Sequence, residues 1–242
     1  MSDPAIPSIA FPFERDRTYS FGELRVFERA LSVACRADAA LRKEWRVPNT
    51  AGMKEAVKVR EETYPLMLLA NAEGYPDSAT FRLTPYGLPK FDALVETEAD
   101  RFQLQITIAD PIWALPDGRF SNGGYDERLV REALNMHGVV HEPIRTFDET
   151  FEACVRGIES ALRKKIGSGT PEIRLLVHAR DYRIHAIDFP FKRVVDRAFD
   201  LSGRAELEAA FGGYYLLDEG SGIFFEQFSL NPLKQSGVQG EH

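Results

Sequence analysis

Two short runs of alternating apolar and polar residues, with only four residues between them, constrain the fold of this chain more than any other feature. They occupy residues 91–97 and 102–109 of the segment KFDALVETEADRFQLQITIAD. Successive side chains of a β-strand point to opposite faces, and a short connection favours antiparallel pairing of the two strands that it joins. The sequence therefore predicts a β-hairpin with its loop at residues 98–101.

A loop at residues 98–101 sets the register of this hairpin. It places Leu94 opposite Gln105 and Asp92 opposite Thr107, with an apolar set of side chains together on the other face. Such alternation is typical of an antiparallel sheet whose polar face simply meets water. The polar face is nevertheless rich in side chains that can bind a ligand, namely Asp92, Glu96, Gln103, Gln105 and Thr107.

Helical patterns precede the hairpin. Ser20 and Glu23 have the spacing of a capping box, and apolar residues at helical spacing then continue to about residue 45. A second helical segment covers about residues 50–72. Because Pro65 lies inside it, the segment predicts either one kinked helix or two shorter helices that meet there.

A third strand and a helix complete the central part of the chain. Residues 79–84 predict a strand that forms a three-strand antiparallel meander with the hairpin. Residues 110–124 contain two prolines and three glycines and predict a long loop. A capping box that begins at Thr146 predicts a helix over residues 147–166, and an apolar strand follows at residues 173–178.

The remaining patterns are weaker. They predict helices at about residues 125–137, 189–199 and 203–211, and a final hairpin formed by residues 214–217 and 223–228. The aromatic side chains of this last hairpin are suited to the core or to the surface of a homodimer.

We expect the chain to form one folded domain. Residues 1–19 contain three prolines and no sustained periodicity, so they predict an irregular arm. Residues 229–242 predict a disordered tail. Neither a repeat nor a linker interrupts the remainder, and residues 20–228 therefore predict a single α/β domain.

Composition and charge set limits on the function. Hydrophobic residues make up 44% of the chain and charged residues 28%, which is typical of a globular protein with a substantial core. The formal net charge of −7 argues against binding of DNA or anionic membranes by bulk electrostatics, although one basic cleft can still bind nucleic acid. No secretory signal and no run of about 18 apolar residues is evident, and Cys35 and Cys154 are expected to be buried thiols. We therefore expect a cytoplasmic protein without a membrane span.

The order of the predicted elements is helix, three strands, helix, strand. Asp92 lies near the start of the second strand, and Gln105-Ile106-Thr107 lies on the third. This arrangement resembles the PD-(D/E)XK nuclease-like, or restriction endonuclease-like, superfamily. The resemblance covers about residues 50–180 and implies an α/β (α+β) fold, with a mixed central sheet that contains the meander and is flanked by helices in the order αβββαβ.

The resemblance also implies roles for particular residues. Asp92 matches the metal-binding aspartate, although Phe91 replaces the usual preceding proline. Gln105 matches the acid of the (D/E)-x-K motif, a position at which some branches of the superfamily use glutamine. Thr107 stands where the lysine belongs, and threonine has no charge to stabilise a hydroxide or a phosphorane. Two oxygen ligands on adjacent strands suit Mg²⁺, which keeps several waters for chemistry.

The preceding helix offers further members of such a site. Glu55 is our candidate for the helical acid, which would bind Mg²⁺ together with Asp92 and Gln105. Glu61 and Glu62 are alternatives on the same helix. Lys54 or Lys58 is a candidate to replace the missing lysine.

Three hypotheses about function follow. The leading one is a catalytically degenerate PD-(D/E)XK-like protein that binds nucleic acid or a partner protein. The second is an active nuclease, a metal-dependent phosphodiesterase that uses Asp92, Gln105 and a helical glutamate. The third is a non-enzymatic interaction module whose polar sheet face is merely solvated. No phosphate-binding P-loop and no G-x-G-x-x-G fingerprint is found, so the common nucleotide-binding motifs are absent from the sequence.

Overall fold

The structure divides into two compact units, residues 1–104 and 105–242. Strand β4 (Arg101–Ala109) runs through the boundary between them. The single domain predicted for residues 20–228 therefore stays a prediction. The computed structural model describes residues 11–46, 48, 50–87, 90–114, 120–122, 146–180, 191–218 and 224–228.

The predicted helix at residues 125–137 and the predicted tail at residues 229–242 lie outside the described residues, as does most of the predicted arm. Within the described residues, no helix is both long and apolar enough to cross a membrane.

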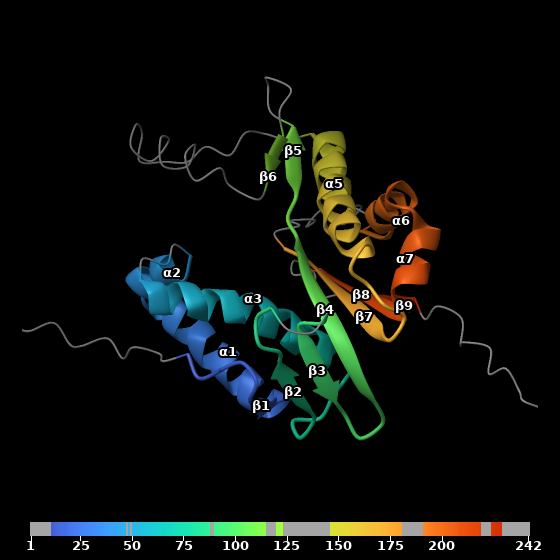
Figure 1. The fold of residues 1–242 in the computed structure, drawn as a ribbon. Coiled ribbons are helices and arrows are strands. Elements are labelled where there is room, and N and C mark those ends of the chain that lie inside the picture. The colour runs from blue at the N-terminus through green and yellow to red at the C-terminus, as the bar shows by residue number, and fades with distance from the viewer. Residues whose placement is uncertain are drawn as a thin grey trace, which may run out of the picture. The chain divides into compact units, whose positions relative to one another are not determined.

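The first unit combines an antiparallel sheet with three helices (Figure 1). The strand order is β1-β2-β3-β4, and every pairing is antiparallel, so the predicted three-strand meander is confirmed. One extra strand, β1, begins inside the segment that predicted an irregular arm. The elements are β1 (Thr18–Ser20), α1 (Phe21–Ala37), α2 (Ala39–Arg46), α3 (Ala51–Ala72), β2 (Thr80–Leu83) and β3 (Ala93–Glu96).

Helices α1 and α2 replace the one long helix predicted up to residue 45. The capping box at the start of α1 is present as predicted, because the Ser20 hydroxyl accepts from the Glu23 amide and the Glu23 carboxylate accepts from the Ser20 amide. The break falls at Asp38, whose backbone is extended. The Asp38 carboxylate accepts a hydrogen bond from the amide of Ala40 (2.8 Å), so the residue that ends α1 also caps α2.

Helix α3 is a single helix of 22 residues that contains Pro65. The structure thus decides between the two readings of this segment in favour of one continuous helix. The Thr50 hydroxyl caps it by accepting from the Met53 amide (3.2 Å). Pro65 and Leu66 are both buried, and the burial of such apolar side chains offsets the cost of a proline inside a helix.

The hairpin of β3 and β4 exists, but its predicted register is wrong by two residues. Glu96 pairs with Arg101 and Leu94 with Gln103, so the loop consists of residues 97–100. Side chains explain the shift. Thr97 Oγ1 accepts from the amide of Asp100 (2.9 Å), and the Arg101 guanidinium lies 2.9 Å from the Glu96 carboxylate. Because a shift of two residues keeps every side chain on its face, the predicted faces are retained.

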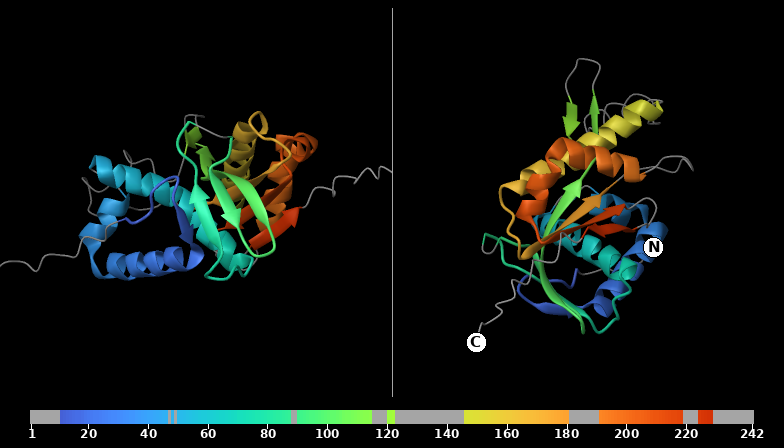
Figure 2. Two further views of the ribbon diagram at one scale, coloured as in Figure 1. Left: turned by 60° about the horizontal axis from the view of Figure 1, so that its bottom comes forward. Right: turned by 90° about the vertical axis from the view of Figure 1, so that its right-hand side faces the viewer.

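The second unit has the strand order β4-β7-β8-β9 with helices α5, α6 and α7 (Figure 1). β7 and β8 are parallel, whereas β8 and β9 form the predicted antiparallel hairpin. Figure 2 shows the three helices lying together, and α5 contacts both α6 and β7. The bounds are α5 (Phe147–Ile166), β7 (Ile173–Ala179), α6 (Phe191–Ser202), α7 (Arg204–Ala210), β8 (Gly213–Asp218) and β9 (Phe224–Phe228).

Two features of the second unit test predictions made from the sequence. Helix α5 has the predicted bounds, and its capping box is present, with the Thr146 hydroxyl accepting from the Glu149 amide (3.2 Å). The loop predicted at residues 110–124 instead contains a short antiparallel pair, β5 (Ile112–Ala114) and β6 (Phe120–Asn122). The chain is therefore mixed α/β, with a mixed sheet and flanking helices, as predicted.

Candidate functional site

The residues predicted to form a metal site are divided between the two units. Glu55 and Asp92 belong to the first unit, and Gln105 and Thr107 to the second. The Gln105 side chain is buried, and its Nε2 donates a hydrogen bond to Ser168 Oγ (3.4 Å). Thr107 is half-buried. The structure therefore gives Gln105 a partner within its own unit.

The first unit contains an acidic cluster built around Glu62 of α3. Glu62 forms an ion pair with Arg15, and both side chains are mostly buried, with exposed fractions of 20% and 12%. Arg15 also donates to the carbonyl oxygen of Thr84 (2.7 Å) through Nη1. The chain ahead of β1 is thereby attached to α3 and to the end of β2.

Tyr86 extends this cluster toward the start of α3. The Arg15 guanidinium carbon lies 3.5 Å from the centroid of the Tyr86 ring, and Lys58 Nζ lies 4.6 Å from it. The Tyr86 hydroxyl donates to Glu55 Oε1 (3.0 Å). Two of the residues predicted as site members, Glu55 and Lys58, thus lie around an aromatic ring that Arg15 covers.

The electrostatics of the cluster centre on one carboxyl group. Burial raises the pKa of Glu62, the ion pair with Arg15 opposes this, and the negative charges of Asp92 and Glu55 raise the pKa further. Among the described residues, no group of three or more His, Cys, Asp or Glu side chains is arranged to hold a metal ion. The Arg15 guanidinium supplies the positive charge beside Glu62, and we derive no catalytic step through Mg²⁺. The metal site of Asp92, Gln105 and Glu55 stays a prediction.

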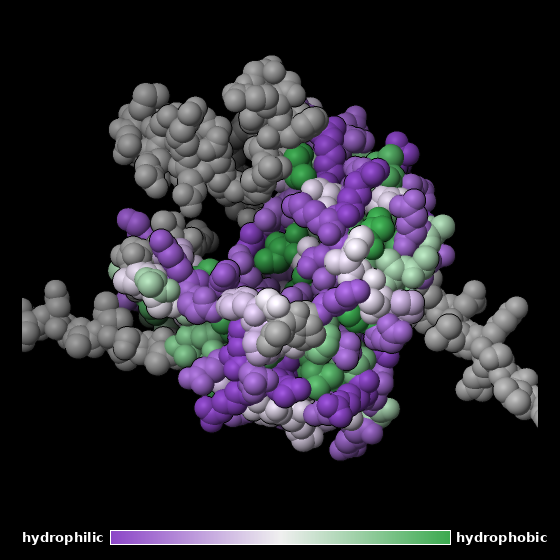
Figure 3. Space-filling model, in the orientation of Figure 1, coloured by the Kyte–Doolittle hydropathy of each residue, from purple (hydrophilic) through white to green (hydrophobic). Residues whose placement is uncertain are grey.

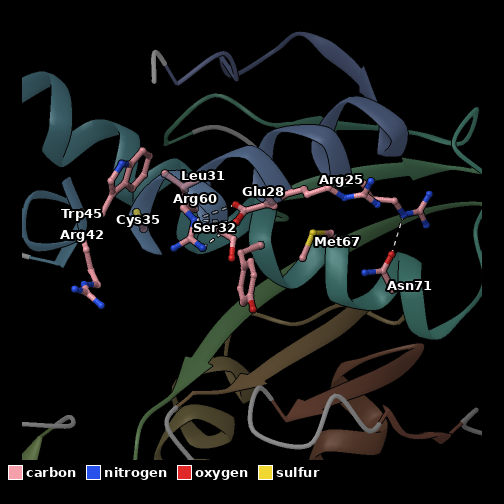
Figure 4. Close-up of a pocket in the computed structure, with 12 residues that line it drawn as sticks. Arg25, Glu28, Leu31, Ser32, Cys35, Arg42, Trp45, Arg60, Met67 and Asn71 are labelled. Atoms are coloured by element: carbon pink, nitrogen blue, oxygen red, sulfur yellow. Dashed lines mark hydrogen bonds and ion pairs between the residues drawn. The ribbon is translucent and has the colours of Figure 1, made fainter. Parts of the chain in front are cut away.

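A groove between α1, α2 and α3 has a volume of about 550 Å³ (Figure 4). Arginines make up a third of its lining and are joined by one acidic residue, while the rest is polar, aromatic or apolar. The lining residues are Arg25, Glu28, Arg29, Leu31, Ser32, Cys35, Arg42, Trp45, Arg60, Tyr64, Met67 and Asn71.

Arg25 fixes one end of this groove. Its Nε donates to Asn71 Oδ1 (2.8 Å), its Nη2 donates to the carbonyl oxygen of Tyr75 (2.8 Å), and its Nη1 pairs with the carboxylate of Asp77 (2.5 Å). All three nitrogens of the guanidinium are therefore engaged, and they join α1 to the C-terminal end of α3 and the turn that follows it. The contribution of Arg25 is structural.

Arg60 occupies the middle of the groove and is held by Glu28. Arg60 Nε donates to Glu28 Oε1 and Arg60 Nη2 donates to Glu28 Oε2, both at 2.9 Å. The Glu28 side chain is only 6% exposed, whereas that of Arg60 is 33% exposed. Such a two-pronged pair fixes the plane of the guanidinium.

Arg29 on α1 and Arg42 on α2 are exposed, and within the described parts of the chain neither of them takes part in an ion pair. Their charge is therefore available to a ligand. Cys35 also lines the groove. The pKa of its thiol is raised overall, because the effect of burial outweighs the lowering by the charges of Arg60 and Arg42. The thiol is thereby kept protonated, so Cys35 contributes surface and not charge to the groove.

The opposite end of the groove is aromatic. Trp45 is buried, and its indole Nε1 has no hydrogen-bond partner among the described residues. The Arg60 guanidinium carbon lies 5.8 Å from the Trp45 ring and 4.9 Å from the Tyr64 ring. Figure 4 shows Trp45 and Arg42 at one end, Arg60 and Glu28 in the middle, and Arg25 with Asn71 at the other end.

Sequence reasoning missed this groove. Its arginines come from three helices, and the net charge of −7 indicates an acidic protein as a whole. One local signal was available, because Arg25 and Arg29 are spaced i, i+4 and therefore lie on one face of α1. Figure 3 shows hydrophilic and hydrophobic side chains interspersed over the visible face of the described residues.

Comparisons with protein-family models, with curated proteins and with solved structures found no match to this chain.

Proposed function

We propose that this chain is a non-catalytic nucleic-acid-binding protein, and that the groove between α1, α2 and α3 contacts the phosphate backbone. The observation that carries the proposal is the lining of the groove, in which four arginines are accompanied by one acidic side chain. Glu28 is already neutralised by Arg60. Arg25 pairs with Asp77, so Arg29 and Arg42 supply the remaining positive charge at the groove of a protein whose net charge is −7.

The positions of the arginines favour a polymeric anion over a compact one. Arg42, Arg60 and Arg25 follow one another along the groove and do not converge on one point (Figure 4). A single phosphate or carboxylate is best bound by arginines that converge on it. Arg25 is held by Asp77 and Arg60 by Glu28. Arg29 and Arg42, which come from two different helices, are therefore the residues that would contact successive phosphates of a nucleic-acid backbone, where such contacts supply most of the affinity.

The proposal retains the degenerate PD-(D/E)XK-like core. The observed order of α3, β2, β3, β4, α5 and β7 supports an αβββαβ core. The Glu62–Arg15 pair supports degeneracy, because a resident guanidinium competes with any metal for the carboxylate. A nuclease assay with Mg²⁺ or Mn²⁺ tests this directly, and metal-dependent cleavage abolished by Asp92→Ala would contradict it.

The binding test compares charge reversal inside and outside the groove. Arg29→Glu/Arg42→Glu reverses the two arginines without ion pairs in the described residues. Lys54→Glu/Lys164→Glu changes the net charge equally at exposed positions outside the lining. We expect fluorescence anisotropy with a labelled oligonucleotide to show loss of binding for the first variant and a much smaller change for the second.

Two outcomes would overturn the proposed function. One is the absence of oligonucleotide binding by the wild-type protein at low salt. The other is an equal loss in both variants, which would mean that only the overall charge matters. If the wild-type protein binds polyglutamate but no oligonucleotide, the groove recognises an acidic partner protein instead.

A further inference from the structure

We infer that the groove selects single-stranded nucleic acid, and that Tyr64, backed by the fixed Arg60 guanidinium, is the surface on which a base stacks. This inference rests on the proposed function and adds the class of strand that the site accepts. It depends on three side chains of the groove, namely Tyr64, Arg60 and Trp45.

Arg60 is held in place by its hydrogen bonds to Glu28. Its two hydrogen bonds of 2.9 Å and a third of 3.2 Å, from Nε to Glu28 Oε2, hold the guanidinium against a buried carboxylate. A free arginine would lose side-chain entropy when it met a ligand. Arg60 has already lost that freedom, so it serves as a preformed surface and not as a mobile phosphate contact.

Aromatic rings lie around the Arg60 guanidinium. The guanidinium carbon lies within 6 Å of both the Tyr64 and the Trp45 ring, which is the range of a cation–π contact. Trp45 is 9% exposed and therefore belongs to the wall. Tyr64 is half-buried and lines the groove, so it is the more exposed of the two aromatic side chains.

Such a surface accepts a base that is free to leave its own stack. Bases in a duplex are stacked on one another and present only their edges, whereas bases of a single strand can stack on tyrosine or on a guanidinium plane. Arg29 and Arg42 provide phosphate contacts on the same groove. A stacking surface together with charges along its length is the arrangement that single strands require and duplexes cannot use.

The experiment measures affinity for three probes, a labelled oligothymidylate, a duplex of the same length and polyglutamate. Tyr64→Ala is compared with Tyr64→Phe, which keeps the ring. We expect the wild-type protein to prefer the single strand. Tyr64→Ala should weaken single-strand binding by roughly 5- to 150-fold, the range found when one base–aromatic stack is removed. Tyr64→Phe should bind as the wild type does.

A second readout reports stacking itself. An oligonucleotide with one 2-aminopurine should lose fluorescence on binding to the wild type and to Tyr64→Phe, and retain it with Tyr64→Ala. Polyglutamate affinity and the unfolding midpoint of each variant show whether Tyr64→Ala is folded. If Tyr64→Ala is misfolded, the comparison moves to Tyr64→Leu, which must show the same selective loss.

The outcomes separate this inference from the proposed function. If Arg29→Glu/Arg42→Glu abolishes binding but the duplex binds at least as well as the single strand, the inference is wrong and the proposed function stands. The same conclusion follows if folded Tyr64→Ala or Tyr64→Leu binds the single strand as the wild type does. If Arg29→Glu/Arg42→Glu binds the oligonucleotide as the wild type does, the proposed function is wrong, and the inference that rests on it is wrong too.

Discussion

The Arg60 guanidinium and the buried Glu28 carboxylate face each other in a two-pronged pair, with both principal hydrogen bonds at 2.9 Å. The pair joins α3 to α1 in the middle of the arginine-lined groove. Its two members differ in burial, because Glu28 is almost fully buried and Arg60 is one-third exposed. Removing Arg60 and removing Glu28 should therefore lower the free energy of unfolding by different amounts.

Arg60→Ala should be more destabilising than Glu28→Ala. Removing Arg60 leaves a carboxylate buried without its partner, which costs about 3–5 kcal/mol. Removing Glu28 leaves a guanidinium that can reach water, so we expect about 1–3 kcal/mol. Urea unfolding of the two variants measures the difference. Equal losses would mean that packing, and not the buried charge, determines the cost.

The Glu62 cluster predicts a pH dependence of stability. The pKa of Glu62 is raised above its ordinary value of 4.5, so the folded state favours the protonated carboxyl. The associated stability is present below that value and is lost as the pH rises through the raised pKa. The unfolding free energy of the wild type relative to Glu62→Gln should therefore fall as the pH increases above 4.5. If the difference in unfolding free energy between the wild type and Glu62→Gln stays constant or increases with pH, the pKa of Glu62 is not raised in the folded state.

The hairpin loop should depend on Thr97 more than on the ion pair beside it. Thr97 Oγ1 accepts from the Asp100 amide (2.9 Å), and Thr97→Ala should cost about 1 kcal/mol. Arg101 and Glu96 are largely exposed, at 67% and 44%. Solvent screening makes such pairs weak, so Arg101→Ala should have little effect on the midpoint of chemical unfolding. A larger loss for Arg101→Ala would show that the pair, and not the hydroxyl, fixes the register.

Gly212 should tolerate no side chain. A Cβ atom there would lie 2.1 Å from the carbonyl oxygen of Pro171, and backbone cannot move aside as a flexible side chain can. Gly212→Ala should destabilise the protein by at least about 1–3 kcal/mol, the usual cost of forcing extra atoms into a packed site. Gly52→Ala is the matched control, because a Cβ at Gly52 meets nothing within 4 Å. Thermal unfolding of both variants distinguishes the two positions.

Local signals in the sequence predicted the parts of the fold that local interactions decide. The capping box at Thr146 and Glu149 gave α5 its correct start, and the alternation of the hairpin gave the correct faces. The register was missed because it depends on side-chain contacts of Thr97 and Glu96 in the loop. Such contacts become visible only after the backbone is in place.

The candidate site was less predictable than the fold. Asp92 and Glu55 were chosen from a motif, and the structure surrounds them with Glu62, Arg15 and Tyr86, of which Arg15 had no signal in the sequence. The groove requires three helices to meet, so residues 31 positions apart, such as Arg29 and Arg60, come to one surface only through packing. Hydrophobic periodicity describes one helix at a time and does not predict how three helices pack against one another.

Arg25 has a consequence for how the groove can be engineered. A single planar side chain spans from α1 to Asn71, Tyr75 and Asp77, so its length acts as a spacer that sets the separation of α1 from the end of α3. Lysine, a point charge on a flexible stem, would hold fewer of these partners and let the helices slide. Arg25 therefore sets the separation of the two helices at this end of the groove, while the Arg60–Glu28 pair joins the same helices in its middle.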